Sequence, residues 1–219
     1  MRSEQISISV APEAQKLGIN VVAAVFTAAQ ISNKRAALEE KKKELITKIA
    51  SVVLENNPIL AAYRELHEIC GTGDIMPPAE HLITLLRKNG RLPNINTAVD
   101  SYNLVSAESF LSIGAHDLSK VKGNLAIKVT DGSELYVPLG AAAPEKVKNG
   151  GYACVDAEKI VCRMDVKQCE QTKVTKETTE FIVYIQGNKN TTMEYLAAAL
   201  DKVCKYICEF CNCTVLKRI

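Results

Sequence analysis

The most informative stretch of the sequence is LPNINTAVDSYN, residues 92–103. Its proline predicts an extended connector over residues 91–96, which leads into a helix over about residues 97–111. Short polar side chains recur on one face of that helix at i, i+4 and i+7 spacing: Asn96, Asp100, Asn103 and Ser106.

That polar face is unusual because a solvated helix face normally carries Lys, Glu, Gln or Arg, which are good helix formers. Asn, Asp and Ser favour caps and fixed hydrogen bonds instead. The face therefore either satisfies a buried loop or lines a ligand pocket. The other side of the helix, with Val99, Tyr102 and Val105, is expected to pack into the core.

Upstream of this helix, the sequence predicts two strands and then a series of helices. Residues 5–10 alternate polar and apolar side chains, and residues 18–26 are evenly apolar, as in an interior strand. The charged stretch 32–55 predicts an amphipathic helix. Its lysines at positions 41–43 fit a solvated face better than a phosphate-binding patch. Prolines and glycines delimit two more helices, over residues 58–70 and 79–88.

Downstream of Gly114 the sequence pattern changes to short β-rich segments separated by turn residues. We expect a turn over residues 114–117 and a hairpin turn at Asp131-Gly132. A long helix over residues 193–211 and a strand over residues 214–217 complete the chain. The predicted strands between these features are residues 125–129, 134–137, 152–155, 160–163 and 181–185.

This order predicts an α+β fold, a mixed β-sheet with flanking helices, because helices gather in the first half of the chain and strands in the second. The 219 residues suit a single domain over residues 1–219. Within it we expect a helix-rich part over residues 1–112 and a strand-rich part over residues 113–187. The helix over residues 190–211 is then an appended element.

Composition excludes several classes of protein. A hydrophobic fraction of 47% and a charged fraction of 24% are those of a globular chain rather than a disordered one. The net charge of +2 argues against nucleic-acid binding by bulk charge alone. No apolar run approaches the roughly 20 residues that span a bilayer, and no signal peptide is recognised. We therefore expect a cytoplasmic protein without a membrane partner.

Cysteines crowd the end of the chain at positions 204, 208, 211 and 213. The first three share one helix face, where cysteine packs as a small hydrophobe. A zinc site, which requires four converging ligands, and a redox pair of Cys208 and Cys211 are the less favoured alternatives. We expect neither a metal nor a cofactor.

Searches for catalytic motifs give negative results. The sequence contains no nucleophile elbow, no His-Glu-x-x-His, no phosphate loop and no dinucleotide-binding glycine pattern. Two of the three histidines, His67 and His81, lie on predicted helices and are expected to be surface or packing residues. The third, His116, lies beside the polar helix and is a candidate site residue.

Charged residues near the predicted strands provide further candidates. Glu134 shares one strand face with Tyr136. Arg163 follows an apolar strand and is flanked by Asp156 and Asp165. It either pairs with one of these carboxylates or holds an anionic group of a substrate.

The stretch 93–103 resembles the Pro-x-Ile-Asn-x-x-Val-Asp-x-x-Asn signature of the B3/4 domain, which occurs in the phenylalanyl-tRNA synthetase beta subunit and in free-standing relatives. The resemblance covers roughly residues 12–187. Its other landmarks follow in the expected order: Ala62-Tyr63-Arg64, Gly71, Gly114, Asp117, Glu134, Pro138-Leu139-Gly140, Asp156, Cys162-Arg163 and Thr172 through Thr178.

The resemblance implies an α+β fold with a pocket, and an activity that hydrolyses the ester between a wrong amino acid and its tRNA. Such hydrolysis needs a positioned water and oxyanion donors, without a metal or a covalent nucleophile. The editing histidine of the synthetase family falls on Gly114 here, and His116 lies two residues further on. The family's acidic residue that recognises a tyrosine hydroxyl aligns with Tyr184, and Gly114 and Arg163 are the types expected in the free-standing branch.

Two functions follow as expectations. One is an aminoacyl-tRNA deacylase acting in trans, and the other is a non-catalytic module that binds tRNA or an amino acid. Neither is a complete aminoacyl-tRNA ligase. The expected partner is tRNA or aminoacyl-tRNA rather than DNA, with Arg87, Lys88 and Arg91 near the pocket helix, and the oligomeric state stays open.

Residue patterns and the resemblance together nominate one set of substrate-binding residues, without naming a catalytic residue or a metal ligand. These residues are Asn94, Asn96, Asp100, Asn103, Ser106, Gly114, His116, Glu134, Asp156, Arg163 and Tyr184. In the first hypothesis Glu134 or Asp100 holds the amino group of the substrate, and Arg163 contacts a carbonyl or phosphate oxygen.

Overall fold

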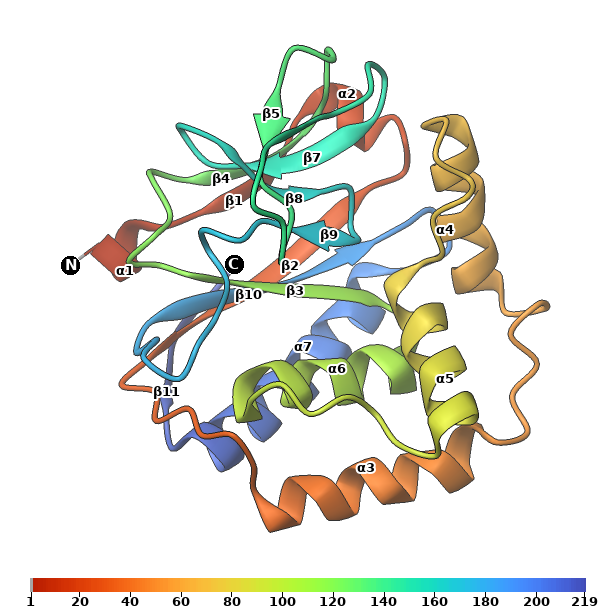
Figure 1. The fold of residues 1–219 in the computed structure, drawn as a ribbon, viewed down its shortest axis with the longest axis vertical. Helices are drawn as coiled ribbons and strands as arrows, with labels where there is room; N and C mark the ends of the chain where they lie inside the picture. Colours follow the sequence, from red (N-terminus) through yellow and green to blue (C-terminus); the bar gives the residue numbers. More distant parts are fainter. Residues whose placement is uncertain (1) are drawn as a thin grey trace.

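Two apolar segments far apart in the sequence form the centre of the fold in the computed structural model, which describes residues 2–219. Strand β2 (Asn20–Thr27) pairs antiparallel with β10 (Phe181–Gly187) along its whole length. Strands β3 (Ser112–Asp117) and β11 (Thr214–Arg218) complete a four-stranded sheet in the order β11-β2-β10-β3 (Figure 1).

A second sheet lies above the first in the view of Figure 1 and has the strand order β1-β4-β7-β8-β9. Strands β1 and β4 are parallel and the other neighbours are antiparallel, so this sheet is mixed. A small third sheet pairs β5 with β6. The strands of these two sheets are β1 (Ile8–Val10), β4 (Leu125–Val129), β5 (Leu135–Tyr136), β6 (Glu145–Lys146), β7 (Tyr152–Val155), β8 (Ile160–Arg163) and β9 (Lys167–Gln168).

Helices α3, α6 and α7 lie on the side of the four-stranded sheet that faces away from the second sheet, and α4 and α5 stand beside them (Figure 1). The helices are α1 (Arg2–Gln5), α2 (Pro12–Gln15), α3 (Ala36–Ile49), α4 (Pro58–Ile69), α5 (Pro78–Asn89), α6 (Thr97–Ser109) and α7 (Met193–Cys211).

The four-stranded sheet is buried on both faces along β2, β3 and β10, whereas its edge strand β11 is partly exposed. Alternate residues of a strand point to opposite sides, and in β2 the side chains of Val22, Ala24 and Phe26 pack against the helices. Those of Ala23 and Val25 pack against the second sheet. This double burial explains why β2 reads as an evenly apolar run in the sequence.

Local signals set the helix boundaries. The Asn57 side chain accepts hydrogen bonds from two backbone amides at the start of α4, and Pro58 occupies the first position of that helix. Gly90 ends α5 with a left-handed φ of 66°. Thr192 caps α7 through its hydroxyl. The structure thus confirms the predicted α+β class, with a mixed sheet and flanking helices.

Two expectations about the strands are wrong. Residues 112–117 form the buried strand β3 rather than a turn, because β3 pairs with β10, which lies far along the chain. Asp131-Gly132 forms a tight turn, with a φ of 87° at the glycine, but it does not join a hairpin. Strand β4 pairs with β1 and β7, and β5 pairs with β6.

The cysteines of the C-terminal helix pack in the core, as expected. Cys204 and Cys211 are buried against the helices and β2, and Cys208 and Cys213 lie partly exposed beside them. Burial raises the pKa of Cys204 to about 11. Helix α7 is therefore part of the main hydrophobic core.

Two searches over the described residues give no candidate. No helix is long and apolar enough to cross a membrane. No group of three or more His, Cys, Asp or Glu side chains within residues 2–219 gathers where it could hold a metal ion.

Candidate functional site

The main cavity of the structure has a volume of about 810 Å³. It lies where several layers meet: strand β3, helices α5 and α6, the turn between β8 and β9, and the loops at residues 75–76, 138–141 and 173–174. This volume is within the roughly 300–1,000 Å³ of typical small-molecule sites. We call it the main cavity below.

The floor of the main cavity is neutral. Its polar groups are the Tyr102 hydroxyl and the amides of Asn103 and Gln168. Burial raises the pKa of the Cys162 thiol to about 12, and burial also raises the pKa of Tyr102, so both groups stay uncharged at neutral pH. Buried residues that form this floor include Val99, Tyr102, Ile113, Gly114, Cys162 and Val174.

The rim is exposed and mixes apolar with charged side chains. Lys167 and Lys173 lie on one side, and Lys173 is ion-paired with Glu170. The other exposed residues of the rim are Met76, His81, Ile95, Leu139 and Glu145. A ligand with an uncharged part and an anionic part would fit this arrangement, because the charged lining residues lie at the rim apart from Asp165, which is paired with His67.

Gly114 sets the shape of the floor. A Cβ at this position would lie 3.0 Å from Nε2 of Gln168 and 3.2 Å from the Tyr184 hydroxyl oxygen. The Gln168 amide therefore occupies the space that a side chain at position 114 would enter. The Gln168 amide also lies beside the Tyr102 hydroxyl. Gly114, Gln168 and Tyr102 therefore form one polar corner of the cavity.

The polar face of α6 is divided between two purposes. Asn96 caps the helix, since its Oδ1 accepts from the Val99 amide at 3.0 Å and its Nδ2 donates to the Val174 carbonyl at 3.1 Å. Ser106 donates to the Leu111 carbonyl at 2.6 Å. Asn103 lines the cavity, and its side chain makes no hydrogen bond to any residue of the described chain.

Asp100 forms a buried ion pair. Its Oδ2 lies 2.6 Å from Nζ of Lys42, and its Oδ1 accepts from the Ile95 amide at 2.9 Å. Nζ of Lys42 also donates to Oδ1 of Asn94 at 2.6 Å. Burial raises the pKa of Asp100, although the Lys42 ammonium and the Ile95 amide lower it. The expectation that Lys42 lies on a solvated face is wrong, because this lysine is only 4% exposed.

The cavity-facing side of α6 is thus Val99, Tyr102 and Asn103 rather than the row of Asn96 and Asp100. Val99 and Tyr102 also contact the hydrophobic core, as expected. The side chains of Asn96 and Asp100 hold the connector before α6 in place, so they shape the cavity wall from behind.

His116 and Tyr184 lie between the two sheets, outside the cavity lining. Their rings stack with centroids 5.6 Å apart. Nδ1 of His116 lies 2.9 Å from the Thr172 hydroxyl, and its buried Nε2 has no partner among the described residues. Burial lowers the pKa of His116 to about 3, so the ring is neutral.

Glu134 and Asp156 stabilise turns. Glu134 accepts from the backbone amides of Asp131 and Gly132. Asp156 accepts from three backbone amides and from Nζ of Lys159 at 2.6 Å. Neither residue lines the main cavity.

Arg163 points away from the cavity because it follows Cys162, which lines the floor, on the same strand. It lies beside Tyr136, and its guanidinium lowers the pKa of that phenol, which burial raises overall. Arg163 pairs with neither of the predicted carboxylates. Asp156 binds Lys159, and Asp165 binds His67.

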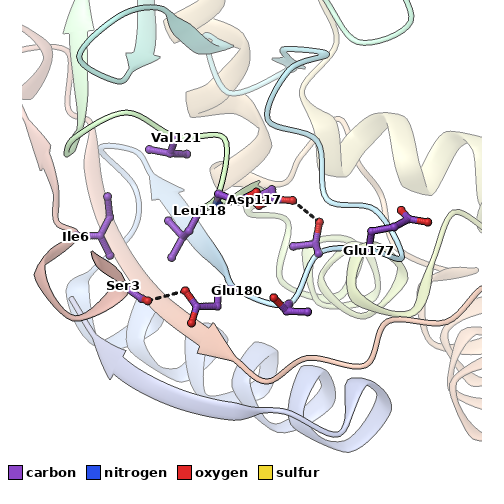
Figure 2. Close-up of a pocket in the computed structure, with 10 residues that line it drawn as sticks. Ser3, Ile6, Asp117, Leu118, Val121, Glu177 and Glu180 are labelled. Atoms are coloured by element: carbon purple, nitrogen blue, oxygen red, sulfur yellow. Dashed lines mark hydrogen bonds between the residues drawn. The ribbon is translucent and has the colours of Figure 1, made fainter. Parts of the chain in front are cut away.

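A second, smaller pocket of about 290 Å³ lies beside the N-terminal segment (Figure 2). Its polar side chains bond to one another. Ser3 donates to Glu180 at 2.7 Å, and Thr178 donates to Asp117 at 2.6 Å (Figure 2). A polar ligand here would have to compete with these two hydrogen bonds.

The structure brings two of the predicted site residues, Asn103 and Gly114, into the main cavity. Sequence reasoning missed Gln168, Lys167 and Lys173, which come from a two-residue strand and a loop without any recognisable pattern. One signal was present, because residues 138–140, which the family resemblance includes, lie along the cavity wall.

Fold and cavity together define an α+β domain with a pocket at the junction of two sheets and a helical layer. A family model for the B3/4 domain matches residues 67–212, and the chain belongs to this family. No curated protein matches its sequence.

A solved structure gives an independent comparison of the fold. The chain is similar to an N-terminal fragment of the phenylalanyl-tRNA synthetase beta subunit from Pyrococcus horikoshii, with a TM-score of 0.56 and 12% identity. The match covers 96% of this chain and 50% of the fragment, so the chain spans about half the length of that fragment. At this identity the likeness shows the fold alone.

Proposed function

We propose that the main cavity binds the aminoacyl end of a mischarged tRNA and that the chain hydrolyses the ester in trans. The observation that carries this proposal is the cavity itself, with a neutral floor around Gly114 and two lysines at its rim. The aminoacyl side chain occupies the floor, and the tRNA phosphates lie towards Lys167 and Lys173. The likeness to a synthetase fragment supports a tRNA-related substrate.

Hydrolysis at this site would rely on positioning. The Tyr102 hydroxyl and the amides of Asn103 and Gln168 can orient a water molecule and donate to the developing oxyanion. Amino acids with uncharged side chains should be preferred, because a charged side chain would lose its hydration on the floor without gaining a counter-charge. We assign no catalytic residue.

The alternative proposal is a non-catalytic module that binds tRNA or an amino acid in the same cavity. One observation favours it: the cavity presents no free ionised base. The Cys162 thiol is protonated at neutral pH, and the carboxylate of Asp165, which lines the cavity, already binds His67, Ser112 and Tyr152.

A deacylation assay with a panel of mischarged tRNAs tests the proposal. Two variants alter the cavity, Asn103→Ala and Gly114→Ala, and two matched controls, Asn89→Ala and Gly151→Ala, lie outside it. We expect the chain to release uncharged amino acids from tRNA, the cavity variants to lose at least about tenfold in kcat/KM, equivalent to about 1.4 kcal/mol, and the controls to retain it.

The outcomes separate the two functions. Binding of tRNA or an amino acid without any turnover, and weakened by the same two variants, supports the non-catalytic module. Turnover that the cavity variants leave intact would place the activity elsewhere and contradict the proposal.

A further inference from the structure

A fully buried ion pair that the proposed function does not use reaches the main cavity through Asp165, which is one of the lining residues. Nε2 of His67 on α4 lies 2.8 Å from Oδ1 of Asp165, and the side chains of both residues are 0% exposed. Nδ1 of His67 lies 2.7 Å from the Ile75 carbonyl oxygen. The imidazole therefore bridges two segments that are far apart in the sequence.

The hydrogen-bond partners define the charge of His67. A carbonyl oxygen and a carboxylate only accept hydrogen bonds, so both ring nitrogens must carry a proton for both bonds to form. The Asp165 carboxylate also accepts from the hydroxyls of Ser112 and Tyr152. Three donors on one carboxylate favour its ionised form. The pair is thus an imidazolium and a carboxylate.

The two segments that the pair joins both line the main cavity. Ile75 and Met76 belong to one of them. Asp165 belongs to the turn between β8 and β9, and this turn continues into Gln168, which also lines the cavity. The turn includes Met164 in the left-handed region with a φ of 53°, a conformation that needs support from its surroundings.

We propose that His67 and Asp165 are positioning residues that hold the two walls of the main cavity together, so that ligand binding weakens when His67 loses its proton. Deprotonation would leave either the Ile75 carbonyl or Asp165 without its buried donor, and the corresponding wall would relax. The inference rests on the proposed function only in taking the main cavity as the ligand site.

The charged groups around the imidazole are consistent with this reading. Burial lowers the pKa of His67, but the bond to Asp165, the charge of Asp165 and the Ile75 carbonyl together raise it above its ordinary value. Tyr63 on α4, Cys70 just after α4, Tyr152 on β7, Cys162 on β8 and Tyr184 on β10 also surround Asp165. Burial raises the pKa of each of these five groups, so they stay neutral and the imidazolium faces a single counter-charge.

The first test needs no ligand. NMR titration of the full chain should show the His67 ring losing its proton at a pH above about 6.5. The backbone amides of Ile75 and Gln168 should shift with the same midpoint. A ring that keeps one charge state from pH 5 to 9, or amides that ignore its titration, would overturn the inference whether or not the cavity binds aminoacyl esters.

The second test moves the midpoint. Asp165→Asn removes the counter-charge while keeping an acceptor for His67, so the midpoint of the His67 ring should fall below that of the wild type. The matched control is His81→Asn, which changes the exposed histidine at the cavity rim and should leave the midpoint unchanged. If Asp165→Asn fails to fold, the wild-type titration still decides the matter.

The third test measures ligand affinity. The probe is 3′-(phenylalanylamino)-3′-deoxyadenosine, a non-hydrolysable analogue of an aminoacyl-adenosine ester. Its own amino group titrates, so the ratio of the Kd values of Asp165→Asn and the wild type is compared at each pH. If bound probe raises the pKa of His67 by one unit, the probe binds the form with protonated His67 about tenfold more tightly than the deprotonated form.

We expect this Kd ratio to be largest below the wild-type midpoint and to approach one above it, where the wild type has also lost the imidazolium. A ratio that is constant with pH indicates a merely structural role for the pair and overturns the inference. If the probe does not bind, the proposed function loses support, and the first two tests still judge the positioning role.

Discussion

At the scale of single residues, the interior of this protein uses charge for structure and keeps its cavity floor neutral. Two ion pairs are buried in it: Lys42 with Asp100, and His67 with Asp165. Each pair joins segments that are distant in the sequence. Because an unpaired buried charge is costly, both partners are needed to keep those segments together.

Lys42→Ala should destabilise the chain by about 3–5 kcal/mol, because it leaves Asp100 buried without its counter-charge. The matched control is Lys43→Ala, because Lys43 pairs with Glu40 and both side chains are exposed. We expect the control to leave the free energy of unfolding nearly unchanged, because water screens an exposed pair. Urea denaturation at neutral pH measures both values, and equal effects of the two variants would contradict this account of the pair.

The pair of Lys42 and Asp100 explains why the site is only partly predictable from the sequence. The spacing of Asn96, Asp100 and Asn103 correctly marks short polar groups with fixed roles, and Asn103 does line the cavity. The partner of Asp100 is Lys42, 58 positions away, which no local pattern reveals. Helical spacing shows that side chains share a face, but it does not show which of them already have partners.

At the scale of elements, predictability follows the range of the interactions. The bounds of α4 and α5 are close to those expected, because Asn57, Pro58 and Gly90 act within one turn of the helix ends. Strand β3 was missed because its partner β10 lies far along the chain and its sequence contains Gly114 and His116. Pairing of this kind is decided by the whole sheet.

The start of α6 gives the prediction at this scale. Asn96→Ala removes the helix cap and the bond to the Val174 carbonyl, so it should destabilise the chain by at least about 1–2 kcal/mol. Asn96→Asp keeps the capping oxygen and loses only the donor to Val174. We expect it to cost less than the alanine variant in thermal unfolding. The reverse order would show that burying a carboxylate against the Val174 carbonyl costs more than the cap contributes.

At the scale of the whole molecule, the main cavity depends on the packing of all three layers. Its lining comes from α5, α6, β3 and the β8–β9 hairpin, and each of these belongs to a different part of the chain. The α+β class was predictable from the order of helices and strands. The place where the layers leave a gap was not, because it depends on how side chains from every layer fill the interior.

Stability against acid is also a property of the whole molecule, and His116 should determine it between about pH 6.5 and pH 4. Burial lowers the pKa of this histidine to about 3 in the folded chain, against about 6.5 when unfolded. A lowered folded pKa contributes stability that is present above pH 6.5 and is lost as the pH falls towards the folded value. The free energy of unfolding should therefore decline through this window.

The pair of His67 and Asp165 affects stability outside that pH window. The pKa of Asp165 is lowered in the folded chain, so its stabilisation is lost only below its unfolded value of about 3.9. The pKa of His67 is raised, so its stabilisation is fully present below about 6.5 and is lost as the pH rises through the folded value. The slope between pH 4 and pH 6.5 therefore separates His116 from this pair. Asp100, whose pKa burial raises above its ordinary value, acts with the opposite sign, so a variant of His116 is needed to assign the slope.

His116→Phe tests this assignment, because phenylalanine preserves the ring stack on Tyr184 and cannot take up a proton. At neutral pH the variant should lose about 1 kcal/mol with the hydrogen bond to Thr172. Between pH 6.5 and pH 4, its free energy of unfolding should fall less steeply than that of the wild type. His81→Phe, at the exposed cavity rim, should retain the wild-type slope. In urea titrations, the free energy of unfolding of His116→Phe and of the wild type could instead fall equally steeply with pH. That result would mean that protonation of a group other than His116 destabilises the fold in acid.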